Sequence, residues 1–308
     1  MATNPQNKTN DSTTVPTSQL RNRLYRLGKP VRDFLLFSSA YLALIAMAEV
    51  LIVTKLLSLP LSPAVLVAGL LTFAVYGNDR VADVETDEKT APGRAAFVKR
   101  YNRMLYALSA LAYGLAVALA VLGGPAAFAL ALLPGVVWIV YAQDWLPSFG
   151  QVKRLKQVFI LNSVLVAGAW ALVIVFLPIA FAGAAITPAA GVVFVFFFLA
   201  AFISVEVPNV RDLAGDREIG VKTLPVVLGI RGTRYFLYSV AGLGVAIVAT
   251  AYVTDILGWA AAAGLMLSLV ILLGITVCLG RTDNNSALTI TAECSRLPML
   301  ALVIVPLL

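Results

Sequence analysis

Carboxylate side chains recur at intervals of four residues in the stretch YGNDRVADVETDEKTAPGR, which runs from Tyr76 to Arg94. The acids with this spacing are Asp79, Asp83 and Asp87. On an α-helix, residues four apart lie near one face of the helix. Carboxylates that share a face repel one another unless a cation neutralises them. The spacing therefore predicts a site that binds a cation.

The stretch VPNVRDLAGDREIGVKTLPVVLG, from Val207 to Gly229, repeats this pattern. Asp212 and Asp216 are four residues apart, and Asn209 precedes them by one helical turn. The chain contains no histidine, which excludes imidazole bases and the usual zinc and Ser-His-Asp sites. A site with oxygen ligands alone favours a hard cation such as Mg²⁺, which completes its coordination shell with water and phosphate oxygens. The two segments together predict a diphosphate substrate bridged by metal.

Basic residues near both acidic segments fit an anionic substrate. Each of them could alone act as a topology signal, but together they could hold a diphosphate and stabilise it as a leaving group. The residues that we expect to bind the diphosphate are Arg94, Lys153, Arg154, Arg217 and Lys222.

The elements that must position these residues are membrane helices. The chain has 308 residues, a mean hydropathy of +0.90 and only 13% charged residues, and its apolar runs have the length of about 20 residues that crosses a bilayer. Residues 1–32 form an expected disordered polar tail followed by a basic juxtamembrane segment, and residues 33–308 form one all-α transmembrane domain. The nine spans expected are roughly 34–54, 61–77, 101–122, 125–142, 157–178, 188–207, 233–253, 256–280 and 287–308.

The distribution of basic residues predicts how this domain sits in the membrane. With a cytoplasmic N-terminus, all but two of the 23 Lys and Arg residues fall on the cytoplasmic side or at its edge, the exceptions being Lys55 and Arg296. This agrees with the positive-inside rule, so orientation accounts for the net charge of +7 better than nucleic-acid binding does. Both acidic segments then open on the cytoplasmic side, and an integral multi-pass protein with a cytoplasmic active-site mouth is expected.

Three further polar residues lie within the expected spans. Tyr141 lies at the cytoplasmic end of the fourth span, and Asn162 follows the basic stretch that precedes the fifth. Glu49 lies deep in the first span, where a carboxylate is costly and suggests function. In the ninth span, Glu293 and Arg296 have a spacing that would allow them to pair on one helix face.

These motifs resemble those of the UbiA superfamily of intramembrane prenyltransferases. The stretch NVRDLAGDREIGVKTLPVVLG is similar to the second Asp-rich motif of that family, including the trailing G-x-K-T-L-P, and Asn209 matches its menaquinone-type branch. The first motif departs from the family form N-D-x-x-D-x-x-x-D. A gapless alignment on Asp83 and Asp87 places Arg80 at the first Asp, whereas Asn78-Asp79 match N-D if one residue is inserted. Which of Asn78, Asp79 and Arg80 meets the metal stays open.

The resemblance implies nine helices around a central cavity and Mg²⁺-dependent transfer of a polyprenyl group from a polyprenyl diphosphate to a hydrophobic acceptor, with membrane lipid as the solvent. Asp83, Asp87, Asp212 and Asp216 would be catalytic. Candidates for contact with the cavity or the acceptor would be Tyr141, Asn162 and Glu49; alternatively, Asn162 makes a hydrogen bond between helices and Glu49 holds helices together. The metal ligands would be drawn from Asn78, Asp79, Asp83, Asp87, Asn209, Asp212 and Asp216. A terpene cyclase of the same superfamily, which needs no acceptor, is the alternative. A transporter is a different class, which the position of the acids at span ends disfavours.

Overall fold

The computed structural model describes residues 29–85, 88, 91–142, 159–218, 220–282 and 284–304, and in this part of the chain every regular element is helical. The all-α class is therefore confirmed. A helix over Lys29–Phe37 comes first. The elements that follow are α2 (Ala40–Leu56), α3 (Ala64–Ala82), α5 (Pro92–Ala120), the 3₁₀-helix η1 (Val121–Gly123), α6 (Gly124–Ala142), α7 (Leu161–Ala182), α8 (Pro188–Arg211), α9 (Leu213–Glu218), α10 (Leu224–Val253), α11 (Trp259–Cys278), α12 (Asn285–Cys294) and α13 (Met299–Ile304).

Local sequence signals explain where several helices begin or break. Pro92 and Pro188 occupy the first positions of α5 and α8, where a missing N–H has no cost. The Thr187 side chain caps α8 by accepting a hydrogen bond of 3.2 Å from the Ala190 N–H. Within α10, Gly229 adopts a φ of 67°, which glycine alone reaches without strain, and this break separates the first turn of α10 from the rest.

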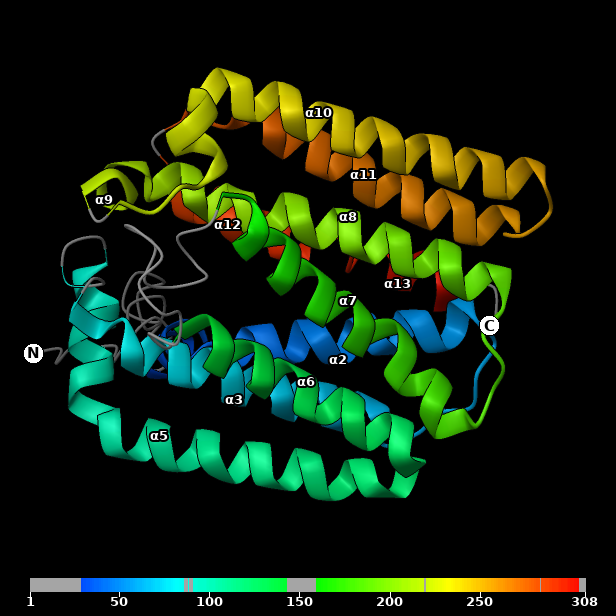
Figure 1. Cartoon of the computed structure of the whole chain (residues 1–308), viewed down its shortest axis with the longest axis horizontal. Helices are drawn as coiled ribbons and strands as arrows, with labels where there is room; N and C mark the ends of the chain where they lie inside the picture. The colour runs from blue at the N-terminus through cyan, green and yellow to red at the C-terminus, as the bar shows by residue number, and fades with distance from the viewer. Residues whose placement is uncertain are drawn as a thin grey trace, which may run out of the picture.

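The expected count of nine spans is not confirmed. In the described part of the chain, six helical segments are long and apolar enough to cross a membrane, or seven if Lys29–Phe37 and α2, bent by 70°, form one span. One of the six, Pro92–Ile139, spans α5 and most of α6, which run in opposite directions in Figure 1. The expected ninth span is two short helices, α12 and α13, interrupted before Pro298, which cannot continue a helix ladder.

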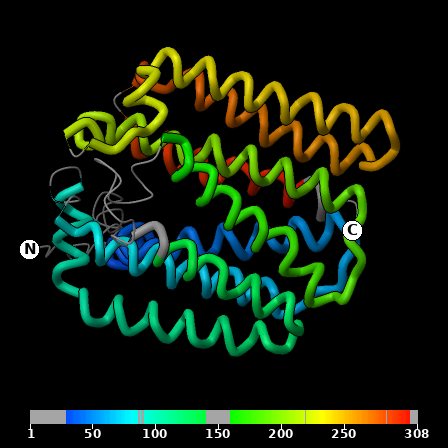
Figure 2. The backbone as a smooth tube through the Cα atoms, in the orientation of Figure 1, coloured from blue at the N-terminus to red at the C-terminus, as the bar shows by residue number. Residues whose placement is uncertain are grey.

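The long helices run roughly along the long axis of the molecule (Figures 1 and 2), and their contacts form a closed series, or ring. From α5 to α8, each helix packs against the next in the sequence; α10 packs against both α8 and α11. The ring closes because α13 packs against both α11 and α2, and α2 packs against α3, which returns to α5. Segments far apart in sequence are thereby brought to the same end of the bundle.

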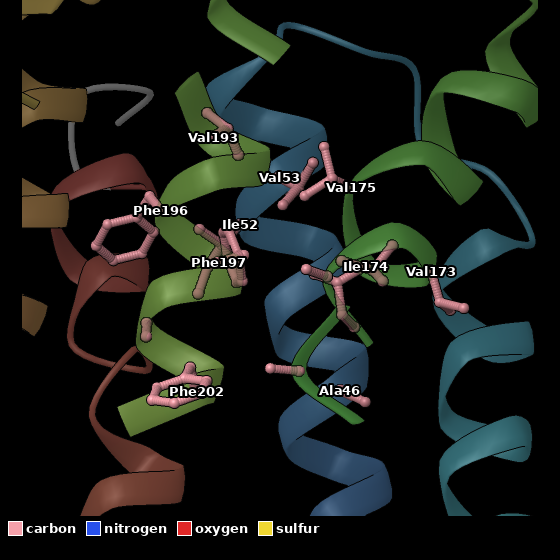
Figure 3. Close-up of a cluster of buried hydrophobic side chains, with 14 of the residues drawn as sticks. Ala46, Ile52, Val53, Val173, Ile174, Val175, Val193, Phe196, Phe197 and Phe202 are labelled. Atoms are coloured by element: carbon pink, nitrogen blue, oxygen red, sulfur yellow. The ribbon is translucent and has the colours of Figure 1, made fainter. Parts of the chain in front are cut away.

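Apolar side chains fill the seam between α2, α7 and α8 (Figure 3). Ile52 and Val53 of α2, Ile174 of α7 and Phe197 of α8 are all buried there, whereas the buried Phe196 points from α8 toward the red helices on its other side. Because lipid is as apolar as these side chains, close packing holds the helices together. Apolar residues occupy the middle of α7 and α8, whereas polar residues cluster toward the N-terminus of α7 and the C-terminus of α8, where the candidate site lies.

Candidate active site

Both acidic segments lie at the same end of the helix bundle, as expected from the sequence. The end of α3 and the start of α5 are at the left in Figure 1, and so are the end of α8 and the whole of α9. Asn78 and Asp79 belong to the C-terminal end of α3, and Asn209 to the last turn of α8. The opposite end of the bundle carries the connections from α7 to α8 and from α10 to α11.

In each segment a helix ends at an aspartate. Asp83 is the C-cap of α3, with its N–H bonded to the Asp79 carbonyl oxygen at 2.9 Å, and Asp212 is the C-cap of α8, with its N–H bonded to the Pro208 carbonyl oxygen at 3.0 Å. The expectation of one continuous helix face is therefore only partly met, because α3 and α8 stop at these residues. Helix C-termini carry partial negative charge, so a carboxylate there is unfavourable unless a cation compensates it.

Two hydrogen-bonding groups hold the second segment in place. Arg211 forms a bidentate ion pair with Asp212, with Nε at 2.8 Å and Nη2 at 2.7 Å from the two carboxylate oxygens. Thr223 donates from Oγ1 to Asp216 Oδ2 at 3.3 Å, which links α9 to the start of α10. The sequence motif contains both partners, but their roles depend on where the chain turns after α8.

Asn209 belongs to a buried polar network that joins α7 to α8. Its Nδ2 donates to Glu206 Oε2 at 3.1 Å, and Ser163 Oγ donates to Glu206 Oε1 at 2.5 Å. Glu206 is completely buried. Sequence reasoning missed this acid although it lies within an expected span, and the rule that drew attention to Glu49 would have found it.

In the first segment, Arg80 is engaged in a contact with another helix and is unsuited to bind a metal ion. Its Nε donates to Ser39 Oγ at 3.1 Å, at the bend between Lys29–Phe37 and α2. A guanidinium has no lone pair to offer a cation. By contrast, the buried Oδ1 of Asn78 has no hydrogen-bond partner. Of the alternatives left open by the sequence, this favours Asn78 over Arg80 as the group that meets a metal.

The deep acid Glu49 has a partner that its sequence spacing did not reveal. Arg296 donates from Nε to Glu49 and from Nη1 to Ser204 Oγ, the latter at 3.1 Å. Glu293 accepts a hydrogen bond of 2.6 Å from Tyr41. The pairing of Glu293 with Arg296 that their spacing allowed is thus replaced by two contacts to α2. The turn at Pro298 explains the difference, because the two residues do not share one continuous helix.

The remaining candidates are placed as follows. Arg94 lies in the first turn of α5, while Arg217 and Lys222 are exposed, in α9 and just before α10. Tyr141 lies in the last turn of α6, and Asn162 in the first turn of α7, where its Oδ1 is buried without a hydrogen-bond partner. Asp87, Lys153 and Arg154 lie outside the described residues, as do residues 1–28 of the tail and basic segment expected over 1–32.

The donors at this end suit a hard cation in type. They are carboxylate and amide oxygens, which Mg²⁺ prefers, and they include the unpartnered Asn78 Oδ1. Among the residues that the structure describes, no three His, Cys, Asp or Glu side chains are grouped closely enough to hold a metal ion. The metal clamp between the two segments, which also involves Asp87, therefore stays a prediction.

Comparison with known proteins identifies a family. The model of the UbiA prenyltransferase family matches residues 35–292, well over half of the chain. No curated protein is similar enough in sequence to match.

Solved structures of UbiA proteins share the fold of this chain. The apo structure of a UbiA homologue from Aeropyrum pernix K1 is 17% identical, with a TM-score of 0.67, and the match covers 86% of this chain and 98% of that one. A homologue from Archaeoglobus fulgidus bound to GPP and Mg²⁺ is 15% identical, with a TM-score of 0.60 and coverage of 88% and 99%. A digeranylgeranylglyceryl phosphate synthase structure is also 15% identical, with a TM-score of 0.58 and coverage of 90% and 98%. With the apolar helices, these matches identify an integral membrane protein.

Proposed function

Because the chain belongs to the UbiA prenyltransferase family, we propose that it transfers a polyprenyl group from a prenyl diphosphate to a hydrophobic acceptor within the membrane. The observation that carries this proposal is the position of two acidic segments at one end of the bundle, each with an aspartate at a helix C-terminus. The Archaeoglobus fulgidus homologues, which bind DMAPP or GPP together with Mg²⁺, support the same assignment.

The acids and amides of the two segments would hold Mg²⁺. In the first segment the ligands are drawn from Asn78, Asp79, Asp83 and Asp87, and in the second from Asn209, Asp212 and Asp216. When bound, the metal neutralises the charge that develops on the departing diphosphate. Before the metal binds, the negative charge of Asp212 is partly compensated by its ion pair with Arg211.

The basic residues of this end would hold the diphosphate oxygens. They are Arg94, Lys153, Arg154, Arg217 and Lys222. In the reaction, the allylic C–O bond breaks and its electron pair leaves with the diphosphate. A nucleophilic atom of the acceptor then forms the new bond to the prenyl carbon and loses the proton that this bond displaces. Cationic side chains favour the first step because they stabilise the leaving group.

Tyr141 and Asn162 remain the proposed contacts of the acceptor. Both lie at the acidic end of the bundle, and the buried, unpartnered Asn162 Oδ1 can accept a hydrogen bond from a hydroxyl or amine. Glu49 is better assigned to holding helices together, because its carboxylate is already paired with Arg296. We further propose that the N-terminus and the acidic end face the cytoplasm, since nearly all basic residues gather there.

The test is release of diphosphate by the purified protein. We would incubate it in lipid nanodiscs with labelled geranylgeranyl diphosphate, Mg²⁺ and a panel of aromatic and glyceryl-phosphate acceptors. Asp83→Asn and Asp212→Asn should each abolish release. Asp255→Asn is the matched control, because Asp255 lies after α10, at the opposite end of the bundle. If no acceptor supports Mg²⁺-dependent release of diphosphate, the proposal is refuted. If a terpene product forms without any acceptor, the protein is a terpene cyclase instead.

A further inference from the structure

Glu206 is a completely buried acid for which the proposed reaction has no use. It lies on α8, one turn before Asn209. A carboxylate inside a membrane protein is costly unless each of its oxygens is hydrogen-bonded. Here Oε1 accepts from Ser163 and Oε2 accepts from Asn209. Glu206 is therefore satisfied by two donors, one from α7 and one from its own helix.

The chemistry of this contact fixes which end of the Asn209 amide faces Glu206. In the structure the NH₂ group of the Asn209 amide is turned toward Glu206, and its Nδ2 donates to Oε2 at 3.1 Å. The amide oxygen is then left as the atom that Asn209 can offer to a ligand. The distinction matters, because an amide oxygen coordinates a hard cation whereas an amide nitrogen does not.

We propose that Glu206 is a positioning residue, which orients Asn209 so that its oxygen is presented to the cation held by the second acidic segment. The inference rests on the proposed function, in which Asn209 and Asp212 are metal ligands one turn apart. Ser163 donates from α7 to the other carboxylate oxygen of Glu206 and makes no contact that orients Asn209. In this arrangement Glu206 touches neither metal nor substrate.

Three variants separate orientation from mere stability. Glu206→Gln keeps the size of the side chain, but its amide offers either oxygen or nitrogen to Asn209 and no longer selects one orientation. In the double variant Glu206→Gln/Asn209→Asp, the donor and acceptor are exchanged, so that Gln donates to the new carboxylate and an oxygen again remains for the cation. Ser163→Ala is the matched control, since it removes a hydrogen bond from Glu206 and leaves the contact with Asn209 intact.

The readout is binding of Mn²⁺, followed by the electron paramagnetic resonance signal of the free ion in the presence of inorganic diphosphate. We expect Glu206→Gln to weaken binding by about 10-fold, at the lower end of the effect of losing a residue that orients a metal ligand. The Mn²⁺ affinity of the double variant should be within about threefold of the wild-type affinity, because the exchanged hydrogen bond again leaves an oxygen of residue 209 for the cation. Ser163→Ala should lower the melting temperature while leaving the Mn²⁺ affinity within about twofold, because the ligand orientation is kept.

Three results would overturn the inference. They are wild-type affinity in Glu206→Gln, a folded double variant that binds as weakly as Glu206→Gln, and a loss in Ser163→Ala equal to that in Glu206→Gln. If Glu206→Gln does not fold, the double variant decides alone, since near-wild-type affinity supports the inference and weak affinity refutes it. Diphosphate release is measured in parallel. An inactive wild type refutes the proposed function, whereas an active wild type with unchanged metal binding in Glu206→Gln refutes only the role of Glu206.

Discussion

The buried ion pair between Glu49 and Arg296 allows a quantitative prediction. It joins α2 to the turn between α12 and α13, and Ser204 of α8 accepts a further hydrogen bond from the same guanidinium at 3.1 Å. The Glu49 side chain is only 9% exposed and the Arg296 side chain only 8%, so water screens the pair little. Removing one partner of such a pair leaves an uncompensated buried charge.

The size of the effect follows from that uncompensated charge. Glu49→Gln or Arg296→Met alone should lower the free energy of unfolding by about 3 kcal/mol, the lower end of the range for breaking a buried pair. The double variant Glu49→Gln/Arg296→Met removes both charges, so its loss should be only about 1 kcal/mol, because a buried pair replaced by neutral side chains is often nearly neutral. The coupling between the two sites is then large and favourable.

The assay is unfolding in mixed micelles, with tryptophan fluorescence recorded during an SDS titration. Diphosphate release by the same samples shows whether Glu49 has a second role. The double variant should stay active within about threefold, which corresponds to about 0.6 kcal/mol, because Glu49 is not expected to touch the substrates. Additive single losses would refute the ion pair, and a folded but inactive double variant would show that Glu49 contacts the acceptor.

Three further predictions concern the acidic end and the packing around it. Arg211→Met should tighten Mn²⁺ binding by about threefold in a paramagnetic resonance titration, since the part-exposed ion pair that competes for Asp212 is worth roughly 0.5–1 kcal/mol; unchanged affinity would contradict this. Gly77→Ala should lower the melting temperature, because its Cβ would lie 2.3 Å from Ser109 Oγ between α3 and α5. Gly274→Ala has open space and is the control, and equal losses would count against the close contact. With Cys278 and Cys294 replaced by alanine, a cysteine at Ala214 should react with a cytoplasmic thiol reagent and one at Asp255 should not; the reverse would invert the proposed orientation.

The helical class and the family were predictable from the sequence because both depend on local patterns. Apolar runs of the right length predict membrane helices, and the spacing of Asp212 and Asp216 within a motif that resembles UbiA proteins located the second acidic segment. Both segments were expected at one end of the bundle from the order of the spans, and the structure places them there.

What the sequence did not reveal depends on contacts between distant residues. The partner of Glu49 is Arg296, which is 247 positions away, and the partner of Glu206 on α7 is Ser163, 43 positions away. Such pairs have no periodic signal. The division of the last span into α12 and α13 was also missed, because apolar composition masked the effect of Pro298. Arg80, the unusual residue of the first segment, could be interpreted only once its contact with Ser39 was known.

The most direct test of the central claim is to locate the metal. Crystals grown with Mn²⁺ and a non-hydrolysable thio analogue of geranylgeranyl diphosphate would show the ion by its anomalous scattering. The account predicts Mn²⁺ within about 2.2 Å of oxygen ligands from both segments, including Asp83 and Asp212, since hard divalent cations bind oxygen at that distance. An ion bound by one segment alone, or bound elsewhere in the molecule, would contradict the account.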